Sequence, residues 1–516
     1  MLIHKPRAFR LIFIVSIFIY IIFIGYISYN NSQSDRFGDE VAHMVGGSYV
    51  LDGKVLYDDL QFNHQPLNYF MSAVVEQATH PENLFLYISK QRLAVFGYGA
   101  LWDMLYVIVF GPLSLLFIIF FEILKFPYAG HKLLGETLAT YPLVFITAIY
   151  IQSLFFQKLI SKWKLIVTSI ASFIAGFSLL PLWVVIIPMN LFIFLKQKNK
   201  KEALLYLALP FITLTGTLFL IISPISLLRE TVIYNIQYFL PAAKQFRPSI
   251  WQVVLFPFFA FIPPFNGVKI IVVAFLIQFF VSGYVLVKKH KAIHWFVLFG
   301  ILTLANFFRV GDSAFSSFHL LPWVGVLLMS ESIFMWHGLH DGNKIIRQIA
   351  LGKLMIYIAL FFFMIVTLKH FVTPNDRANE FYVQYSESEK YGRVIHMLKD
   401  KDDRLMVVPN DPLIYWVAHI DTATRLLEYY TWIYPVPKYN KEIRRVINNN
   451  PPEFFVETGL DLTKDLDVLI KQALERRYTQ INYLGKPSRL YILNSKLKNI
   501  TNAQWEKVQY TLFEQP

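Results

Sequence analysis

Long runs of apolar residues constrain this chain more than any other feature of its sequence. Eleven of them lie within the first 371 residues, and their lengths suit helices that cross the hydrocarbon core of a bilayer. An average soluble domain carries about 25% charged residues, whereas this chain of 516 residues carries 16%. We therefore predict a polytopic α-helical membrane protein. The predicted spans are residues 11–29, 93–110, 112–126, 137–156, 165–180, 181–195, 203–223, 268–287, 294–308, 319–337 and 354–371.

Basic residues in the short loops predict how the spans are oriented. Three basic residues precede the first span within residues 5–10, and lysine clusters recur at 158–164, 196–201 and 288–291. Because basic loops stay on the cytoplasmic side, we predict a cytoplasmic N-terminus and a large first outer loop at residues 30–92. The protein is then a multi-pass protein of the cytoplasmic membrane, in contact with membrane lipid.

One short apolar segment and the distribution of the net charge agree with this predicted orientation of the spans. Residues 251–266 are apolar but short and are broken by three prolines, so we predict an interfacial or re-entrant segment there. The net charge of +13 arises in the membrane loops, because the residues after 371 carry 20 Lys and Arg against 19 Asp and Glu. This distribution is typical of membrane topology and argues against a nucleic-acid partner. The chain has no cysteine, which excludes disulfides and thiolate sites.

The last 145 residues are predicted to form a separate domain outside the membrane. Strand-like and helix-like segments mix in it, which is typical of a small α/β domain. The strand-like segments are 404–409, 453–457, 478–484 and 488–493, and the helix-like segments are 380–400, 438–449 and 463–476. The predicted organisation is a membrane module at residues 1–371 and an extracytoplasmic α/β domain at residues 372–516.

The first outer loop carries six acidic side chains within residues 35–59. Two of them, Asp39 and Glu40, follow closely after the first span. A carboxylate beside apolar surface can have a raised pKa and serve as a general base. An ordinary solvated acidic loop explains the same pair, so the residues alone leave both interpretations open.

The same loop resembles the first outer loop of the GT-C superfamily of membrane glycosyltransferases. The resemblance is to the members that use polyprenyl-phosphate sugars, namely protein O-mannosyltransferases and the aminoarabinose transferases that act on lipid A. The matching pieces, in the superfamily's order, are Asp39-Glu40, Leu51-Asp52-Gly53, Tyr57-Asp58-Asp59 and Pro66-Leu67. The many spans, the large first outer loop and the C-terminal outer domain agree with that superfamily.

The resemblance implies roles for particular residues. Asp39 matches the catalytic aspartate, Glu40 its neighbour, and Glu136 a second acidic position. Arg309 lies in a segment that resembles the superfamily's basic outer loop before a helix beginning near His319. The residues expected to bind the donor phosphate are Arg309, Arg92 and Arg229, and those expected to line the substrate are His64, Tyr57 and His319.

The chain departs from the superfamily pattern at one place, and simpler interpretations stay open for several residues. Some relatives have Glu-Lys-Pro where this chain has His64-Gln65-Pro66, and Gln65 cannot supply the lysine's charge to a phosphate. Glu136 would also suit the first turn of a helix through the helix dipole. A single arginine often only reaches lipid headgroups, and a single loop histidine is often only polar surface.

The sequence and the resemblance together predict an integral membrane glycosyltransferase of the GT-C type. It would move a sugar from a polyprenyl-phosphate donor to a hydroxyl of a glycan, lipid or protein acceptor on the outer face, with inversion and with Asp39 as base. No cofactor is identified, and a divalent metal is left open. A transporter or flippase of lipid-linked sugars and a non-catalytic scaffold are the alternatives. A transporter predicts related halves and broken polar helices near the midplane, whereas polar residues here concentrate in outer loops.

Overall fold

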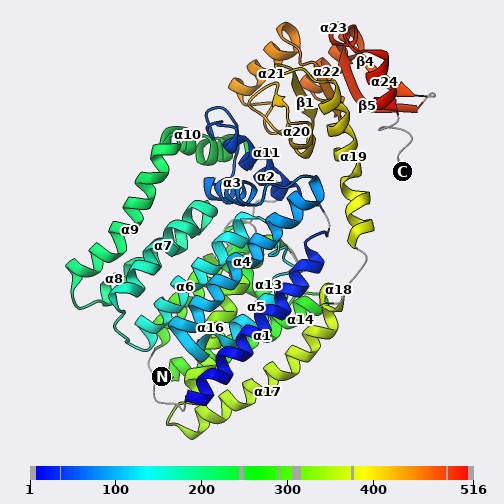
Figure 1. Cartoon of the computed structure of the whole chain (residues 1–516). Coiled ribbons are helices and arrows are strands. Elements are labelled where there is room, and N and C mark those ends of the chain that lie inside the picture. Colours follow the sequence, from blue (N-terminus) through cyan, green and yellow to red (C-terminus); the bar gives the residue numbers. More distant parts are fainter. Residues whose placement is uncertain are drawn as a thin grey trace.

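A bundle of long helices and a smaller α/β domain at one of its ends make up the molecule (Figure 1). The computed structural model describes residues 7–34, 36–242, 249–288, 291–304, 315, 317–372, 377–483 and 486–509. Helices α2 and α3 lie between the bundle and the α/β domain in the view of Figure 1. This arrangement puts the connection between α1 and α4 at the junction of the two parts.

Eleven helices of the bundle each overlap one predicted span. They are α1 (Arg7–Asn31), α4 (Leu84–Phe110), α5 (Leu115–Leu124), α6 (Gly135–Phe155), α7 (Lys162–Ser178), α8 (Trp183–Lys196), α9 (Lys200–Ile221), α14 (Gly267–Lys288), α15 (Ala292–Leu304), α16 (Leu321–Leu339) and α17 (Lys344–Thr367). Within the described residues, six helical stretches are long and apolar enough to cross a membrane, and one of them joins α4 to α5. The exact number of spans stays a prediction.

Short helices connect the long ones. They are α2 (Gly38–Leu51), α3 (Pro66–Thr79), η2 (Gly111–Ser114), η3 (Leu180–Leu182), α10 (Pro224–Leu228), the π-helical turns η4 (Arg229–Ile233) and η5 (Asn235–Phe239), α11 (Leu240–Ala242), α12 (Ile250–Val254), α13 (Phe256–Phe259), η7 (Phe318–Leu320) and α18 (Lys369–Val372). The segment 251–266 thus holds α12 and α13, and neither is long enough to cross a membrane. Its place at the interface stays a prediction.

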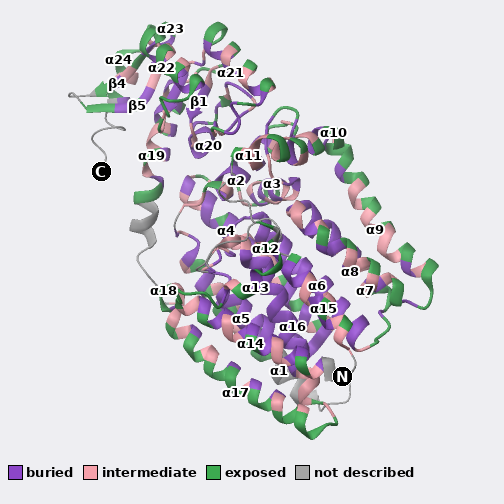
Figure 2. Ribbon diagram, turned by 180° about the vertical axis from the view of Figure 1, so that it is seen from behind, coloured by how far each residue is buried: buried purple, intermediate pink, exposed green. Residues whose placement is uncertain are grey.

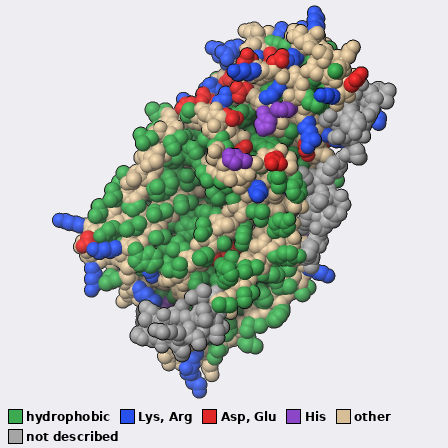
Figure 3. Space-filling model, in the orientation of Figure 1, with side chains coloured by type: hydrophobic (Ala, Val, Ile, Leu, Met, Phe, Trp, Pro, Cys, Tyr) green, Lys and Arg blue, Asp and Glu red, His purple; other side chains and the backbone are tan. Residues whose placement is uncertain are grey.

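The bundle is built around α6, whose residues are all buried. Its hydroxyl side chains fit this apolar setting because they bond to carbonyls of the same helix: Thr140 donates to Glu136 at 2.6 Å and Thr147 donates to Leu143 at 2.9 Å. By contrast, only 6% of an apolar stretch of 18 residues in α9 is buried. Figure 2 shows this gradient from the centre of the bundle to its edge. Figure 3 shows hydrophobic side chains over the flank of the bundle, the surface expected of a lipid-facing wall.

The C-terminal domain is a three-layer α/β structure. Its strands are β1 (Arg404–Val408), β2 (Asp421–Thr422), β3 (Phe454–Glu457), β4 (Tyr478–Tyr483) and β5 (Lys486–Leu493), in the order β2-β1-β3-β5-β4. The pairs β1–β2 and β1–β3 are parallel, and the pairs that β5 makes are antiparallel. The helices are α19 (Arg377–Leu398), α20 (Leu413–Ala418), α21 (Pro437–Asn449), α22 (Asp465–Arg477), α23 (Asn494–Leu497) and α24 (Asn502–Gln509). Alternating strand residues feed two separate cores, one on each face of the sheet.

The C-terminal domain docks on α2, α3 and the start of α4. Trp416 stacks on Tyr87 with ring centroids 4.2 Å apart, and its indole N–H donates to Glu76 at 2.9 Å. The hydroxyl of Tyr49 donates to the carbonyl of Ile420 at 2.7 Å. One apolar core runs from α2 and α3 into the sheet of the domain. The predicted α/β domain is therefore present, and the boundary at 371/372 stays a prediction.

Candidate active site

The acidic pair of the α1–α4 connection lies in the first turn of α2. The helix begins at Gly38, and Asp39 and Glu40 follow directly. No side chain caps this end of the helix, and acidic residues in the first turn are favoured there by the unpaired N–H groups and the helix dipole. Because neighbouring residues of a helix point in different directions, the two carboxylates meet different surroundings.

Glu40 is fully buried in an ion pair with Arg92 of α4. The guanidinium donates to the Glu40 carboxylate at 2.6, 3.0 and 3.2 Å, and the backbone N–H of Leu133 donates to it at 3.2 Å. Arg92 also donates to the carbonyl of Ser34 at 2.7 Å. This geometry favours a structural role for both residues: they hold α2 against α4 and the loop before α6. The assignments of Glu40 to catalysis and of Arg92 to a phosphate stay predictions.

Asp39 has the opposite surroundings. Its side chain is half-buried, and no described residue lies within hydrogen-bond or ion-pair distance of its carboxylate. It faces a cavity of about 470 Å³, which we name the site cavity. A carboxylate without a committed partner, half shielded from water, is available to accept a proton from a bound hydroxyl.

The site cavity has a polar end and an apolar wall. Its polar side chains include Asp39, His43, His64, Asn68, Glu136 and His319, and its apolar ones include Leu179, Leu180, Leu182, Ile236, Phe239 and Leu240. The apolar wall comes from the turn between α7 and α8 and from the segment η4 to α11. Such a hollow suits a ligand with one polar and one apolar part.

Two histidines form a relay beside Asp39. His43 Nε2 lies 2.9 Å from His64 Nδ1, and His43 Nδ1 lies 3.0 Å from the carbonyl oxygen of Leu133. Burial, reinforced by His64, lowers the pKa of His43 to about 4, so His43 is neutral at pH 7. A carbonyl oxygen only accepts, so His43 carries its proton on Nδ1 and accepts from His64 through Nε2. His64 is thereby held with its other nitrogen available at the cavity.

Glu136 and His319 meet at the same cavity although they are 183 residues apart. Glu136 lies in the first turn of α6, and His319 lies in η7, directly before α16. Their side chains approach to 2.5 Å between Nδ1 and Oε1. The carboxylate therefore orients the imidazole at the cavity wall. Four of the predicted site residues, Asp39, His64, Glu136 and His319, thus line one cavity.

The other predicted residues lie elsewhere. The buried Tyr57 donates its hydroxyl to the carbonyl of His64 at 2.8 Å and so supports the loop that carries this histidine. Arg229 bonds to Glu230 at 3.3 Å and to the hydroxyl of Ser226 at 3.1 Å. Arg309 lies outside the described residues. The phosphate assignments of Arg229 and Arg309 therefore stay predictions.

Sequence reasoning missed two residues of this region. His43 lies four residues after Asp39, the spacing that puts two side chains on one face of a helix, and this spacing could have identified it. Lys132 is buried in the loop before α6, with its ammonium 5.1 Å from the ring centroid of Phe37. No local pattern marks Lys132, because only the return of that loop toward α2 brings its charge beside Phe37.

The described residues do not fit a dedicated metal site. Nowhere in the described ranges do three or more His, Cys, Asp or Glu side chains gather in a way that could hold a metal ion. His43 and His64 are already bonded to each other, which occupies a nitrogen of each ring.

The fold is that of a known membrane protein. Neither a protein-family model nor a curated protein sequence matches the chain. The crystal structure of ArnT from Cupriavidus metallidurans bound to undecaprenyl phosphate matches with a TM-score of 0.54 and 11% identity, over 95% of this chain and 98% of that chain. The apo structure of the same ArnT matches with a TM-score of 0.54 and 11% identity, over 93% and 98%. Over 95% of its length the chain thus has the fold of ArnT, and its long apolar helices are those of an integral membrane protein, which confirms the predicted fold class.

Proposed function

We propose that this protein is an integral membrane glycosyltransferase that uses a polyprenyl-phosphate sugar as donor. One observation carries the proposal: Asp39 faces a cavity with an apolar wall and has no partner among the described residues. The match to ArnT, whose crystal structure holds undecaprenyl phosphate, supports the class of donor. The acceptor is a hydroxyl group on the outer face of the membrane, where the positive-inside rule puts the α/β domain.

The reaction is a single displacement at the anomeric carbon. Asp39 accepts the proton of the acceptor hydroxyl while the acceptor oxygen forms its bond to the anomeric carbon. The bond from that carbon to the phosphate oxygen breaks on the opposite side, so the configuration inverts and polyprenyl phosphate leaves. A positioned base of this kind contributes roughly 10²–10⁴-fold to the rate.

The site cavity supplies the remaining parts of this mechanism. Its apolar wall along the α7–α8 turn would hold the first isoprene units of the donor. A phosphate departing at the polar end needs hydrogen-bond donors or positive charge rather than a proton. His64 and His319, each oriented by a bonded neighbour, can donate there only when the ring carries a second proton on Nε2. Arg309 is the predicted guanidinium for the same role. Binding donor and acceptor side by side lowers the entropic part of the barrier.

The experiment compares two carboxylates of the same connection. Full-length protein in nanodiscs receives a polyprenyl-phosphate sugar and a panel of hydroxyl acceptors, and the release of polyprenyl phosphate is measured. Asp39→Asn should lower the rate roughly 10²–10⁴-fold, because an amide cannot accept the proton. Asp52→Asn, a matched change at an exposed residue just after α2, should leave the rate unchanged.

Three outcomes contradict the proposal in different ways. Unchanged turnover in a folded Asp39→Asn variant removes Asp39 as the base. Movement of the donor across the bilayer without cleavage, measured with the protein in sealed liposomes, identifies a transporter. If the protein neither moves nor cleaves the donor with any acceptor of the panel, the protein is a scaffold.

A further inference from the structure

A second hollow lies between the first turn of α2 and the C-terminal domain. Its volume is about 280 Å³, and we name it the junction hollow. The α2 side contributes Arg36, Gly38 and Val41, and the domain side includes Asn410, Glu428 and Thr458. The hollow is therefore formed only where the domain docks on the bundle.

The first turn of α2 separates the two hollows. Gly38 and Val41 are three residues apart and share the face toward the junction hollow, whereas Asp39 and His43 are four apart and share the face toward the site cavity. The charge of Asp39 nevertheless reaches across, because it helps to raise the pKa of Glu428. Asp39 thus lines the site cavity, one residue after Gly38, which lines the junction hollow.

The polar groups of the junction hollow are balanced in charge. Arg36 pairs with Asp411 at 2.6 Å, and Arg489 pairs with Glu387 at 3.2 Å. Burial first and the charge of Asp39 second raise the pKa of Glu428 to about 8, so this carboxyl is protonated at neutral pH. Two cations therefore face two anions and one neutral acid, and the hollow favours neither an anionic nor a cationic ligand.

The remaining polar groups are donors and acceptors of hydrogen bonds. The amide of Asn410 donates to the hydroxyl of Tyr430 at 2.8 Å, and that hydroxyl donates to Glu428 at 3.1 Å. The hydroxyl of Thr458 reaches only the carbonyl of Asn410, at 3.4 Å. The amide oxygen of Asn410, the hydroxyl of Thr458 and the neutral acid of Glu428 thus offer both kinds of hydrogen-bonding group at short spacing.

We infer that the junction hollow binds a sugar ring of a neutral saccharide acceptor, beside the turn of α2 that carries Asp39. The inference rests on the proposed function, which it extends by naming the class of acceptor. A neutral ring rich in hydroxyls needs alternating donors and acceptors without net charge, and the hollow supplies them. A lipid acceptor would need an apolar wall for its chains, and such a wall lines the site cavity instead.

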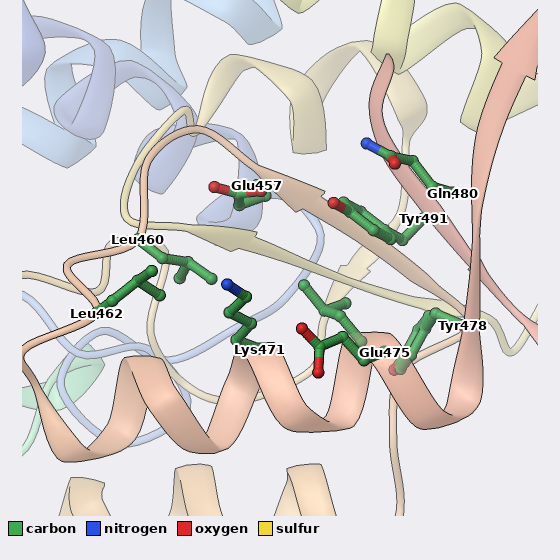
Figure 4. A pocket seen from close by; sticks show the side chains of 9 residues that line it. Glu457, Leu460, Leu462, Lys471, Glu475, Tyr478, Gln480 and Tyr491 are labelled. Carbon is green, nitrogen blue, oxygen red and sulfur yellow. The ribbon is translucent and has the colours of Figure 1, made fainter. Parts of the chain in front are cut away.

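The C-terminal domain contains a third hollow that provides a matched control. It has a volume of about 380 Å³ between α22 and the sheet. Figure 4 shows Lys471 and Glu475 rising from α22, with Gln480 and Tyr491 on the strands opposite. This hollow is polar and open but shares no lining residue with the junction hollow. An amide removed here, in Gln480→Ala, matches the amide removed in Asn410→Ala.

The first test measures binding without any donor. Methyl α-D-mannoside, methyl β-D-galactoside and methyl N-acetyl-β-D-glucosaminide are the probes, and saturation-transfer NMR with full-length protein in nanodiscs is the readout. Wild type should transfer magnetisation to ring protons of at least one probe. Asn410→Ala and the nearly isosteric Thr458→Val should each weaken that affinity about tenfold, as the loss of one buried hydrogen bond does, and Gln480→Ala should not. Transfer to no probe, or transfer lost only in Gln480→Ala, overturns the inference.

The second test separates this inference from the proposed function. In the turnover assay, Thr458→Val should raise the acceptor KM about tenfold and leave the donor KM unchanged. If wild type cleaves the donor but the acceptor KM is the same in Asn410→Ala, Thr458→Val and Gln480→Ala, the acceptor site is wrong and the glycosyltransferase stands. If wild type cleaves no donor, the proposed function itself fails.

Discussion

At the scale of residues, two adjacent carboxylates have been given opposite surroundings. Glu40 is fully enclosed by Arg92 and the N–H of Leu133, and Asp39 is left facing a cavity. The residue pattern alone did not separate the two carboxylates, and only the family resemblance assigned the role of base to Asp39. The partner of Glu40 lies 52 residues away on another helix, so only the packed structure separates a structural acid from a candidate base.

Glu428 provides a prediction about pH at the same scale. In an unfolded chain a glutamate titrates at about 4.3, whereas burial and the charge of Asp39 raise the pKa of Glu428 to about 8. Between these values the folded protein holds a proton that the unfolded chain has lost. The stability that this proton contributes is full below about pH 4 and is lost as the pH rises to about 8.

The variant Glu428→Gln stays neutral at every pH. Its free energy of unfolding should therefore rise relative to that of wild type as the pH increases from about 5 to 8, by at most about 1.4 kcal/mol per pH unit. Above about pH 8 the difference should stop growing. The measurement is the melting temperature followed by tryptophan fluorescence. Parallel pH curves for the two proteins would show that Glu428 titrates as an ordinary glutamate. Besides burial, the groups that influence its pKa are Asp39, Tyr430 and Arg36.

At the scale of elements, the helices were predictable and their contacts were not. Runs of apolar residues mark the bundle helices, and Gly111 with Pro112 marks the turn where α4 ends and η2 begins, a turn at which Gly111 has a φ of +57°. The π-helical turns η4 and η5 leave no such pattern, yet they form part of the cavity wall. The sequence of the loop before α6 likewise has no pattern that predicts its contacts, although its Leu133 contacts both Glu40 and His43.

The ion pair between α2 and α4 supports a prediction at this scale. Removing one partner leaves a buried, uncompensated charge, so Arg92→Met should destabilise the protein by about 3–5 kcal/mol. Replacing both partners, in Glu40→Leu with Arg92→Met, should restore most of that loss because no buried charge is left. Thermal unfolding in detergent measures both effects. If the losses of stability measured for Glu40→Leu alone and Arg92→Met alone add up in the double variant, Arg92 and Glu40 are not coupled and other contacts hold α2.

At the scale of the whole molecule, the candidate site exists because two parts meet. The site cavity belongs to the bundle, and the junction hollow appears only where the C-terminal domain covers α2. The sequence predicted a membrane module, an α/β domain and an acidic connection between spans. Local patterns do not show which residues of the domain and the connection touch, since contacts such as that between Tyr49 and Ile420 join residues 371 apart. Most of the fold was predictable from local patterns, whereas the contacts between the C-terminal domain and α2 were not.

The contact between Trp416 and Tyr87 should control this joining. Trp416 is 8% exposed, stacks on Tyr87 and bonds to Glu76, so Trp416→Ala removes a buried aromatic side chain worth about 3–5 kcal/mol. Because the lost contacts lie between the parts, hydrogen exchange should increase in α3 and at the start of α4 as well as in α20. Trp505→Ala, a change within the domain's own packing, should raise exchange in the domain alone. If Trp416→Ala likewise leaves α3 and α4 unchanged, docking does not order the bundle end, and the junction hollow cannot depend on it.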